Sequence, residues 1–369
     1  MHDKELPYLL VLMDLPGIGS IRARELLRKY NSAYEVLHAL KNEEIKLLTT
    51  HLPIISSKAL QELLDLAYKE IEYMEKNQVN YVFIDDPEYP YRLRHCVDAP
   101  IVLFYKGNIN WNASRSISIV GTRAATNYGL DFCKELVADL KHLNVQIVSG
   151  LAYGIDIQAH KSAIEHGLET VACLGHGLHK IYPSSHSKYT QDILYNGGLT
   201  TEFTTHSVVD KKNFVRRNRI IAGLSQATIV VESAYRGGSY LTAEMANSYN
   251  REVFALPGRV DQPKSKGCNT LIKTEQARLI QSAADLVYIL NWDITTETQS
   301  KTQQTALFIE LSREEEKICN ILKEKNKISL DLLAIEADKS PQEMASILLS
   351  LELNGLVRTL PGKQFEWIG

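Results

Sequence analysis

The nine residues 211–219 contain five basic side chains and one aromatic ring, Phe214. Cationic side chains neutralise the phosphates of a nucleic acid, and a ring among them can stack on an unpaired base. Taken alone, such a run would equally suit a solvated loop. We interpret it as a phosphate-binding surface with a stacking ring, and its candidate residues are Phe214, Arg216, Arg217, Asn218 and Arg219.

A glycine-rich turn follows directly downstream of this basic run. Residues 227–231 are apolar and mostly β-branched, which is typical of a buried strand, and a helical pattern starts at Leu241. Between them, the turn 236–239 directs backbone N–H groups and the positive end of a helix dipole towards one place, where anions bind. A tight turn without any ligand is the alternative, but the neighbouring cations favour a binding site.

The same order of strand, small-residue turn and helix repeats between residues 115 and 290. This order predicts an α/β fold with a doubly wound parallel sheet. Ligands of such sheets sit beyond the carboxyl ends of the strands. We therefore expect the turns to open on one crevice, with the basic run on its rim. The strands are expected at 116–120, 146–148, 170–174, 199–202, 227–232 and 253–256, and the turn residues at the crevice are Gly121, Thr122, Arg123, Ser149, Gly150, Gly175, Gly177, Gly237, Gly238 and Ser239.

Composition and missing motifs exclude several classes of protein. There is no GxGxxG turn followed by the acidic residue of a dinucleotide site and no GxxxxGK[ST] loop. The five cysteines are scattered without metal-ligand spacing, so we expect no metal and no cofactor. The net charge of −3 requires any polyanion site to be a local patch. Without a signal peptide or an apolar run of membrane-spanning length, the expected location is cytoplasmic, with no membrane contact.

Residues 1–78 are predicted to form an all-α domain. Helices are expected at 6–13 and 20–30, joined by Leu15-Pro16-Gly17-Ile18-Gly19, and further helices over 33–77. The first pair resembles a helix-hairpin-helix module, with Ser20 as the N-cap. Such hairpins either contact a DNA phosphate or serve as packing units, and both remain open. The strand-like stretches 82–84 and 101–105 are expected to connect this domain to the next.

The C-terminal part of the chain predicts a tethered winged helix. Residues 291–308 are polar and rich in Gln and Thr, which is typical of a flexible linker. Within 309–369, helical patterns at 312–325, 329–337 and 340–353 precede a hairpin at 357–367. The third helix offers few cations, so a protein partner is favoured over duplex recognition.

Six motifs together resemble the DprA/Smf family of DNA-processing proteins. They are ISIVGTRAATNYG (117–129), SGLAYGIDIQAHKSA (149–163), TVACLGHGLHKIYP (170–183), NFVRRNRIIAGLS (213–225), GGSYLTAEMA (237–246) and REVFALPGRVDQPKSKGCNTLI (251–272). The resemblance implies an extended Rossmann-like core over 79–290. It also implies a homodimer that binds single-stranded DNA and loads the RecA recombinase during natural transformation. Val215 replaces the proline of the family's Phe-Pro-Arg-Arg-Asn-Arg motif, which puts the rigidity of that stretch in doubt.

An enzyme acting on a nucleotide is the competing interpretation. The run GGSYLTAE (237–244) is similar to the GGxGTxxE of nucleoside-monophosphate phosphoribohydrolases, whose glutamate corresponds to Glu244. Tyr240 and Leu241 replace the second Gly-Thr, which removes the turn that a ribose phosphate needs. His160, His176 and His179 lack a paired nucleophile and are interpreted as polar lining. We therefore expect no catalytic residue and a protein that is not an enzyme.

Overall fold

The computed structural model describes residues 4–41, 56–292, 312–325, 327–354, 356–360 and 364–368, which form two compact units. The first unit extends to residue 294 and the second begins at residue 295. The predicted linker at 291–308 lies, apart from its first two residues, outside the described residues. Within the described residues, no helix is long and apolar enough to cross a bilayer.

The first unit is built on a Rossmann-like sheet in which, among the described residues, nine strands pair in the order β1-β2-β6-β5-β4-β3-β7-β8-β9. In this order, the seven strands β6, β5, β4, β3, β7, β8 and β9 pair in parallel, as predicted. At one edge, β2 pairs antiparallel with both β1 and β6. The stretch expected only as a connection thus joins the sheet. The bounds are β1 Asn80–Phe83, β2 Val102–Gly107, β3 Ser116–Val120, β4 Gln146–Ser149, β5 Thr170–Cys173, β6 Gly197–Thr201, β7 Ala227–Val230, β8 Glu252–Ala255 and β9 Arg278–Leu279.

Side chains of the central strands alternate between two hydrophobic cores. Ile117 and Ile119 of β3 pack into one core, while Val120 of the same strand belongs to the other. Successive side chains of a strand point to opposite faces, so a sheet buried on both faces needs apolar residues at nearly every position. One core also contains residues of α6 (Asn127–Asp139), α7 (Ile155–Glu165) and α12 (Ala283–Ile289).

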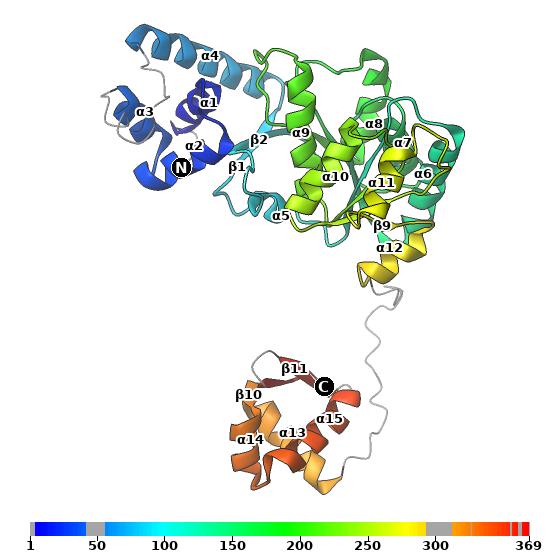
Figure 1. Cartoon of the computed structure of the whole chain (residues 1–369). Coiled ribbons are helices and arrows are strands. Elements are labelled where there is room, and N and C mark those ends of the chain that lie inside the picture. Colours follow the sequence, from blue (N-terminus) through cyan, green and yellow to red (C-terminus); the bar gives the residue numbers. More distant parts are fainter. Residues whose placement is uncertain are drawn as a thin grey trace. The chain divides into compact units, whose positions relative to one another are not determined.

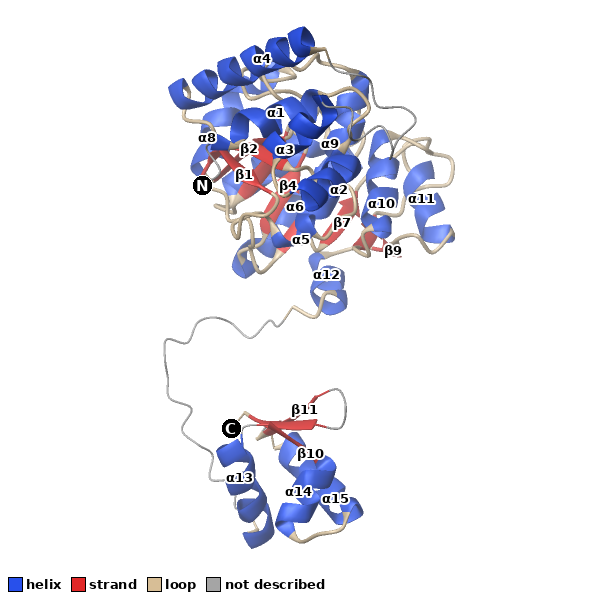
Figure 2. Cartoon of the chain, turned by 90° about the vertical axis from the view of Figure 1, so that its left-hand side faces the viewer, coloured by secondary structure: helices blue, strands red, loops and turns tan. Residues whose placement is uncertain are grey.

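The other core lies under α9 (Lys211–Leu224), α10 (Gly238–Ser248) and α11 (Lys266–Lys273). Figure 1 shows α9 and α10 side by side, and Figure 2 shows the strands enclosed by helices. The basic run 211–219, expected on the rim of the crevice, forms the first part of helix α9. Asp210 caps this helix by accepting a hydrogen bond from Lys212 N at 2.8 Å. Two short helices, α5 (Tyr91–Arg94) and α8 (Thr190–Tyr195), complete the α-helices of the sheet region within the described residues, which also include the 3-10 helices Leu140–Leu143 and Ser184–Tyr189.

Four helices precede the sheet within the described part of the first unit: α1 (Leu6–Asp14), α2 (Ser20–Tyr30), α3 (Ala33–Lys41) and α4 (Ser57–Lys76). The turn between α1 and α2 uses Gly17 at φ 80°, a conformation that favours glycine. Gly19, rather than the predicted Ser20, is the N-cap of α2. The helix-hairpin-helix assignment and the domain boundary at residue 78 stay predictions.

The second unit contains α13 (Arg313–Lys325), α14 (Leu330–Ala337) and α15 (Pro341–Leu353), together with a small sheet in the order β10-β12-β11. Its strands are β10 (Lys327–Ser329), β11 (Val357–Leu360) and β12 (Gln364–Trp367). Ser340 caps α15 through a reciprocal pair of hydrogen bonds with Glu343. The predicted winged helix is confirmed, with β10 as an additional strand, whereas the tip of the hairpin at 361–363 lies outside the described residues.

Candidate nucleic-acid interface

A crevice of about 520 Å³ lies beyond the carboxyl ends of β3, β4 and β7, with α9 and the start of α10 along its side. The turns after three strands contribute to its lining, as the parallel sheet requires. Sequence-predicted residues that line this crevice are Gly121, Thr122, Arg123, Phe214, Arg217, Asn218, Gly237, Gly238 and Ser239.

Phe214 is the aromatic centre of the crevice. Its half-buried ring lies 5.5 Å, centroid to centroid, from the ring of Tyr182, and the guanidinium of Arg123 lies 5.8 Å from the Phe214 centroid. A Cβ on Gly175 would come within 2.8 Å of this ring, so only glycine lets the ring sit where it does. A flat apolar surface beside an exposed cation suits a stacked nucleobase with its phosphate nearby.

The start of α10 presents a helix N-terminus to the crevice. Gly237 is its N-cap and supplies no side-chain cap, and a Cβ on Gly238 would meet nothing within 4 Å. The first-turn N–H groups and the positive dipole end therefore face an open space that suits an anion. By contrast, the N–H groups of Gly121 and Thr122 already donate to Asp156 and to the Glu232 carbonyl within the protein.

Arg217 lies almost entirely within the protein. Its Nη1 donates to the carbonyl oxygens of Gly150 and Cys173, beyond β4 and at the end of β5, and its Nε donates to Asn218 Oδ1 at 3.2 Å. Burial lowers the pKa of the guanidinium, an effect that the nearby Asp156 carboxylate opposes. Burial raises the pKa of Asp156, with Arg217 opposing that shift. Arg217 thus ties two strand ends and a buried carboxylate to α9.

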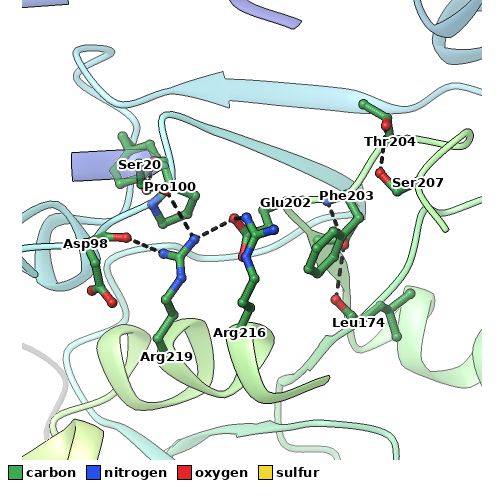
Figure 3. Close-up of polar contacts among 12 residues, drawn as sticks. Ser20, Asp98, Pro100, Leu174, Glu202, Phe203, Thr204, Ser207, Arg216 and Arg219 are labelled. Atoms are coloured by element: carbon green, nitrogen blue, oxygen red, sulfur yellow. Dashed lines mark hydrogen bonds and ion pairs between the residues drawn. The ribbon is translucent and has the colours of Figure 1, made fainter. Parts of the chain in front are cut away.

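The other two arginines of the run meet at one carboxylate, as Figure 3 shows. Glu202 Oε2 accepts from Arg219 Nη2 and, at 3.1 Å, from Arg216 Nη2. Arg219 is buried and also donates to the Asp98 carbonyl, whereas the Arg216 side chain is 55% exposed. Neither arginine lines the crevice.

The remaining predicted turn residues lie below or beside the crevice. Ser149 is buried, and its hydroxyl donates to the Ile119 carbonyl at 2.6 Å. Gly150 lines a neighbouring cavity of about 50 Å³ together with Phe214. A Cβ on Gly177 would come within 2.5 Å of the Thr204 carbonyl oxygen, so this glycine permits a close backbone approach.

Ten lining residues were not among the predicted site residues, and three of these ten carry an ionisable side chain. Tyr182 belongs to the motif HKIYP, where its aromatic character was the available signal, and Asp156 follows the Gly-rich turn 150–154. Lys211 belongs to the basic run and is exposed where it lines the crevice. The charge of the run predicts a place on the rim of the crevice, but it does not predict that Lys211 lies in the first turn of α9.

The residues that an enzyme would use are poorly placed for catalysis. Glu244 is exposed and does not line the crevice. His160 is buried, its Nδ1 lies 2.8 Å from Thr170 Oγ1, and burial lowers its pKa to about 3. Burial likewise lowers the pKa of His176 and of His179. Among the described residues, no group of three His, Cys, Asp or Glu side chains could hold a metal ion.

Comparison with known proteins agrees with this architecture. The model of the family DNA recombination-mediator protein A matches residues 80–291, and that of the DprA winged helix domain matches residues 302–363. Protein Smf of Escherichia coli is 34% identical over 324 residues, which is 84% of each chain.

Two solved structures share the fold at comparable identity. DNA processing protein A of Streptococcus pneumoniae superposes with a TM-score of 0.57 at 30% identity, covering 73% of this chain and 98% of that one. DNA processing protein A of Helicobacter pylori, described for its single-stranded DNA binding mode, superposes with a TM-score of 0.51 at 27% identity, covering 58% of this chain and 96% of that one. From its sequence and its sheet, the chain belongs to the DNA recombination-mediator protein A family, also called DprA/Smf.

Proposed function

We propose that this protein binds single-stranded DNA in the crevice and holds it without chemistry. The observation that carries this proposal is Phe214, which lies in an open cavity beside the exposed cations Arg123 and Lys211. The bases of a duplex are paired and stacked on one another, so a ring inside a cavity is accessible only to an unpaired base. Stacking on such a ring is worth ~1–3 kcal/mol per base.

Anion sites next to the ring would hold the backbone of the strand. The open N-terminus of α10 at Gly238 offers N–H groups, and Arg123 and Lys211 offer charge. Family membership and the H. pylori relative described for its single-stranded DNA binding mode support this assignment. The exposed position of Glu244 outside the crevice argues against the phosphoribohydrolase alternative.

The proposal extends to what the family resemblance implies about partners. The protein would act as a homodimer in the cytoplasm and load the RecA recombinase onto the strand that it holds, during natural transformation. The winged helix would contact a protein rather than duplex DNA. Light scattering of the full chain tests the dimer, and a monomer at micromolar concentration would contradict it.

Fluorescence anisotropy with labelled oligothymidylate and a blunt duplex of the same length tests the central assignment. We expect the single strand to bind far more tightly. Equal affinity for both would refute the stacking role of the crevice. Release of adenine from AMP at an ordinary enzymatic rate would instead support the competing enzyme.

A further inference from the structure

A second cavity lies on the opposite side of helix α9. This cavity, here called the hairpin groove, has a volume of about 720 Å³ and is lined by Met13, Leu15, the residues 17–22, Glu25, Asp98, Arg216 and Arg219. At 100° per residue, Arg216 and Arg219 project from α9 on the side away from Phe214 and Arg217. One helix therefore separates the crevice from the hairpin groove, and its width with side chains is about 10–12 Å.

The near wall of the groove is the N-terminus of α2. Gly19 is its N-cap and supplies no side-chain cap, while the Ser20 hydroxyl is engaged by Arg219 Nη2 at 3.3 Å. The first turn of this eleven-residue helix, with its uncapped N–H groups and positive dipole end, lines the same groove as Arg216, whose side chain is 55% exposed and also pairs with Glu202. This pairing suits a phosphate.

A buried carboxylate oxygen provides an independent indication of a ligand. Glu202 lines an inner chamber of about 70 Å³ that shares Gly19, Ser20 and Arg216 with the groove. The Glu202 side chain is 3% exposed; its Oε2 accepts from both arginines, but Oε1 meets no donor among the described residues. A buried acceptor left without a donor is costly, so this oxygen calls for an N–H group from a bound molecule.

We propose that the hairpin groove is a second nucleotide subsite for the same single strand, an inference that rests on the proposed function. A phosphate of the strand lies between the N-terminus of α2 and Arg216. The amino group of the attached base donates to Glu202 Oε1, as carboxylates do to cytosine N4. Thymine carries no amino group, so the subsite favours cytosine over thymine.

Substitution of Gly19 tests the phosphate contact without threatening the fold. Gly19 has φ −86°, and a Cβ there would meet nothing within 4 Å, so side chains are tolerated. Asp and Asn are both favoured N-caps, and the matched variants Gly19→Asp and Gly19→Asn differ only in charge. Thermal unfolding of both should match or exceed that of the wild type.

Anisotropy is measured with the shortest oligodeoxycytidylate that binds and with a much longer one. For the long strand we expect affinity to fall in the order wild type, Gly19→Asn, Gly19→Asp, with Asp roughly five-fold below Asn. The slope of log affinity against log salt should flatten by ~0.7 in the Asp variant, for one lost phosphate. The short strand, held by the crevice alone, should bind all three proteins equally.

The base contact is tested in the same assay. Wild-type protein should prefer long oligodeoxycytidylate over long oligothymidylate, and Glu202→Gln should abolish that preference. The subsite is overturned if Gly19→Asp leaves the long strand unaffected, or if it weakens short and long strands equally. Wild-type protein that binds no single strand would overturn the proposed function as well, whereas tight binding indifferent to Gly19 overturns the subsite alone.

Discussion

Helix α9 has two kinds of cation, and they lie in different surroundings. Arg217 and Arg219 are buried and donate to carbonyl and carboxylate oxygens of the protein itself. Lys211, Lys212 and Arg216 are exposed, and Lys211 lines the crevice directly. A dense run of basic residues in a sequence therefore does not tell which role each charge has. The buried arginines donate to groups of the protein itself, Arg216 is exposed but also pairs with Glu202, and the exposed lysines are left for a ligand.

This difference changes what each substitution should do. Loss of a buried arginine leaves carbonyl oxygens without donors, so its effect falls on folding. Loss of an exposed cation removes an interaction with solvent or ligand, so its effect falls on binding and its salt dependence.

The largest effect is expected for Arg217→Ala. The substitution leaves two buried carbonyl oxygens without their donor and takes away the nearby cation that favours ionised Asp156. The free energy of unfolding should fall by about 3 kcal/mol, as read from urea denaturation. Lys212→Ala, which removes an exposed cation from the same helix, is the control and should leave stability unchanged. Stability unchanged in both variants would remove the distinction between buried and exposed cations.

Phe214→Ala comes next and should act on binding alone. The affinity for oligothymidylate should drop by ~1–3 kcal/mol for one lost stacked base, with an unchanged salt slope because no charge is removed. Phe214→Leu keeps an apolar side chain without the flat ring and should lose affinity almost as much. Full affinity in the leucine variant would show that apolar contact, not stacking, holds the strand.

A smaller effect is expected for Lys211→Ala. The lost single-strand phosphate contact should flatten the plot of log affinity against log salt by ~0.7. Lys212→Ala serves again as the matched variant, since Lys212 lines neither the crevice nor the hairpin groove. Equal slopes for the two variants would mean that the exposed cations act as a diffuse field and not as a defined site.

The smallest effect concerns the contact between the N-terminal helices and the sheet region. His206 Nε2 lies 2.6 Å from Asp14 Oδ2 and its Nδ1 3.8 Å from Glu70 Oε2. The hydrogen bond with Asp14 raises the pKa of His206 above its ordinary value of 6.5, although burial opposes the shift. A raised pKa in the folded state means that the stabilisation is fully present below about pH 6.5 and is lost as the pH rises through the folded value.

Thermal unfolding at several pH values checks this expectation. As the pH rises from about 6.5 through the folded-state pKa of His206, the melting temperature of the wild type should decline slightly relative to that of His206→Gln, which cannot titrate. Parallel pH profiles for the two proteins would exclude a contribution from His206 to the docking of the N-terminal helices.

Periodicity and turn chemistry were sufficient to predict the parallel core. The apolar runs at β3, β5 and β7 and the glycine turns after them predicted one crevice; Gly121 and Gly238 line the cavity at these strand ends, whereas Gly175 and Gly177 of the turn after β5 do not. The edge was harder to predict. β2 follows a segment with Pro87, Pro90 and Pro100 that suggests a connection, and β9 has two residues that are both exposed. The run 101–105 is strand-like in sequence, but its pairing with the sheet is not indicated by it, and β9 lacks the signal of a buried strand.

The burial of individual arginines could not be predicted because it depends on contacts distant in sequence. Arg217 reaches a carbonyl 67 positions away and Arg219 one 121 positions away. The composition of residues 211–219 gives only their charge. The packing of α9 on the sheet decides which side of the helix is buried, and therefore that Arg217 points inward and Arg216 outward.

Photo-crosslinking tests the central claim most directly. An oligonucleotide with one 5-iodouracil is bound, irradiated and mapped by mass spectrometry. If the crevice holds the unpaired strand, crosslinked peptides should contain Phe214 or Tyr182, and Phe214→Ala should reduce their yield. Crosslinks confined to residues 312–368, with none at the crevice, would contradict the account.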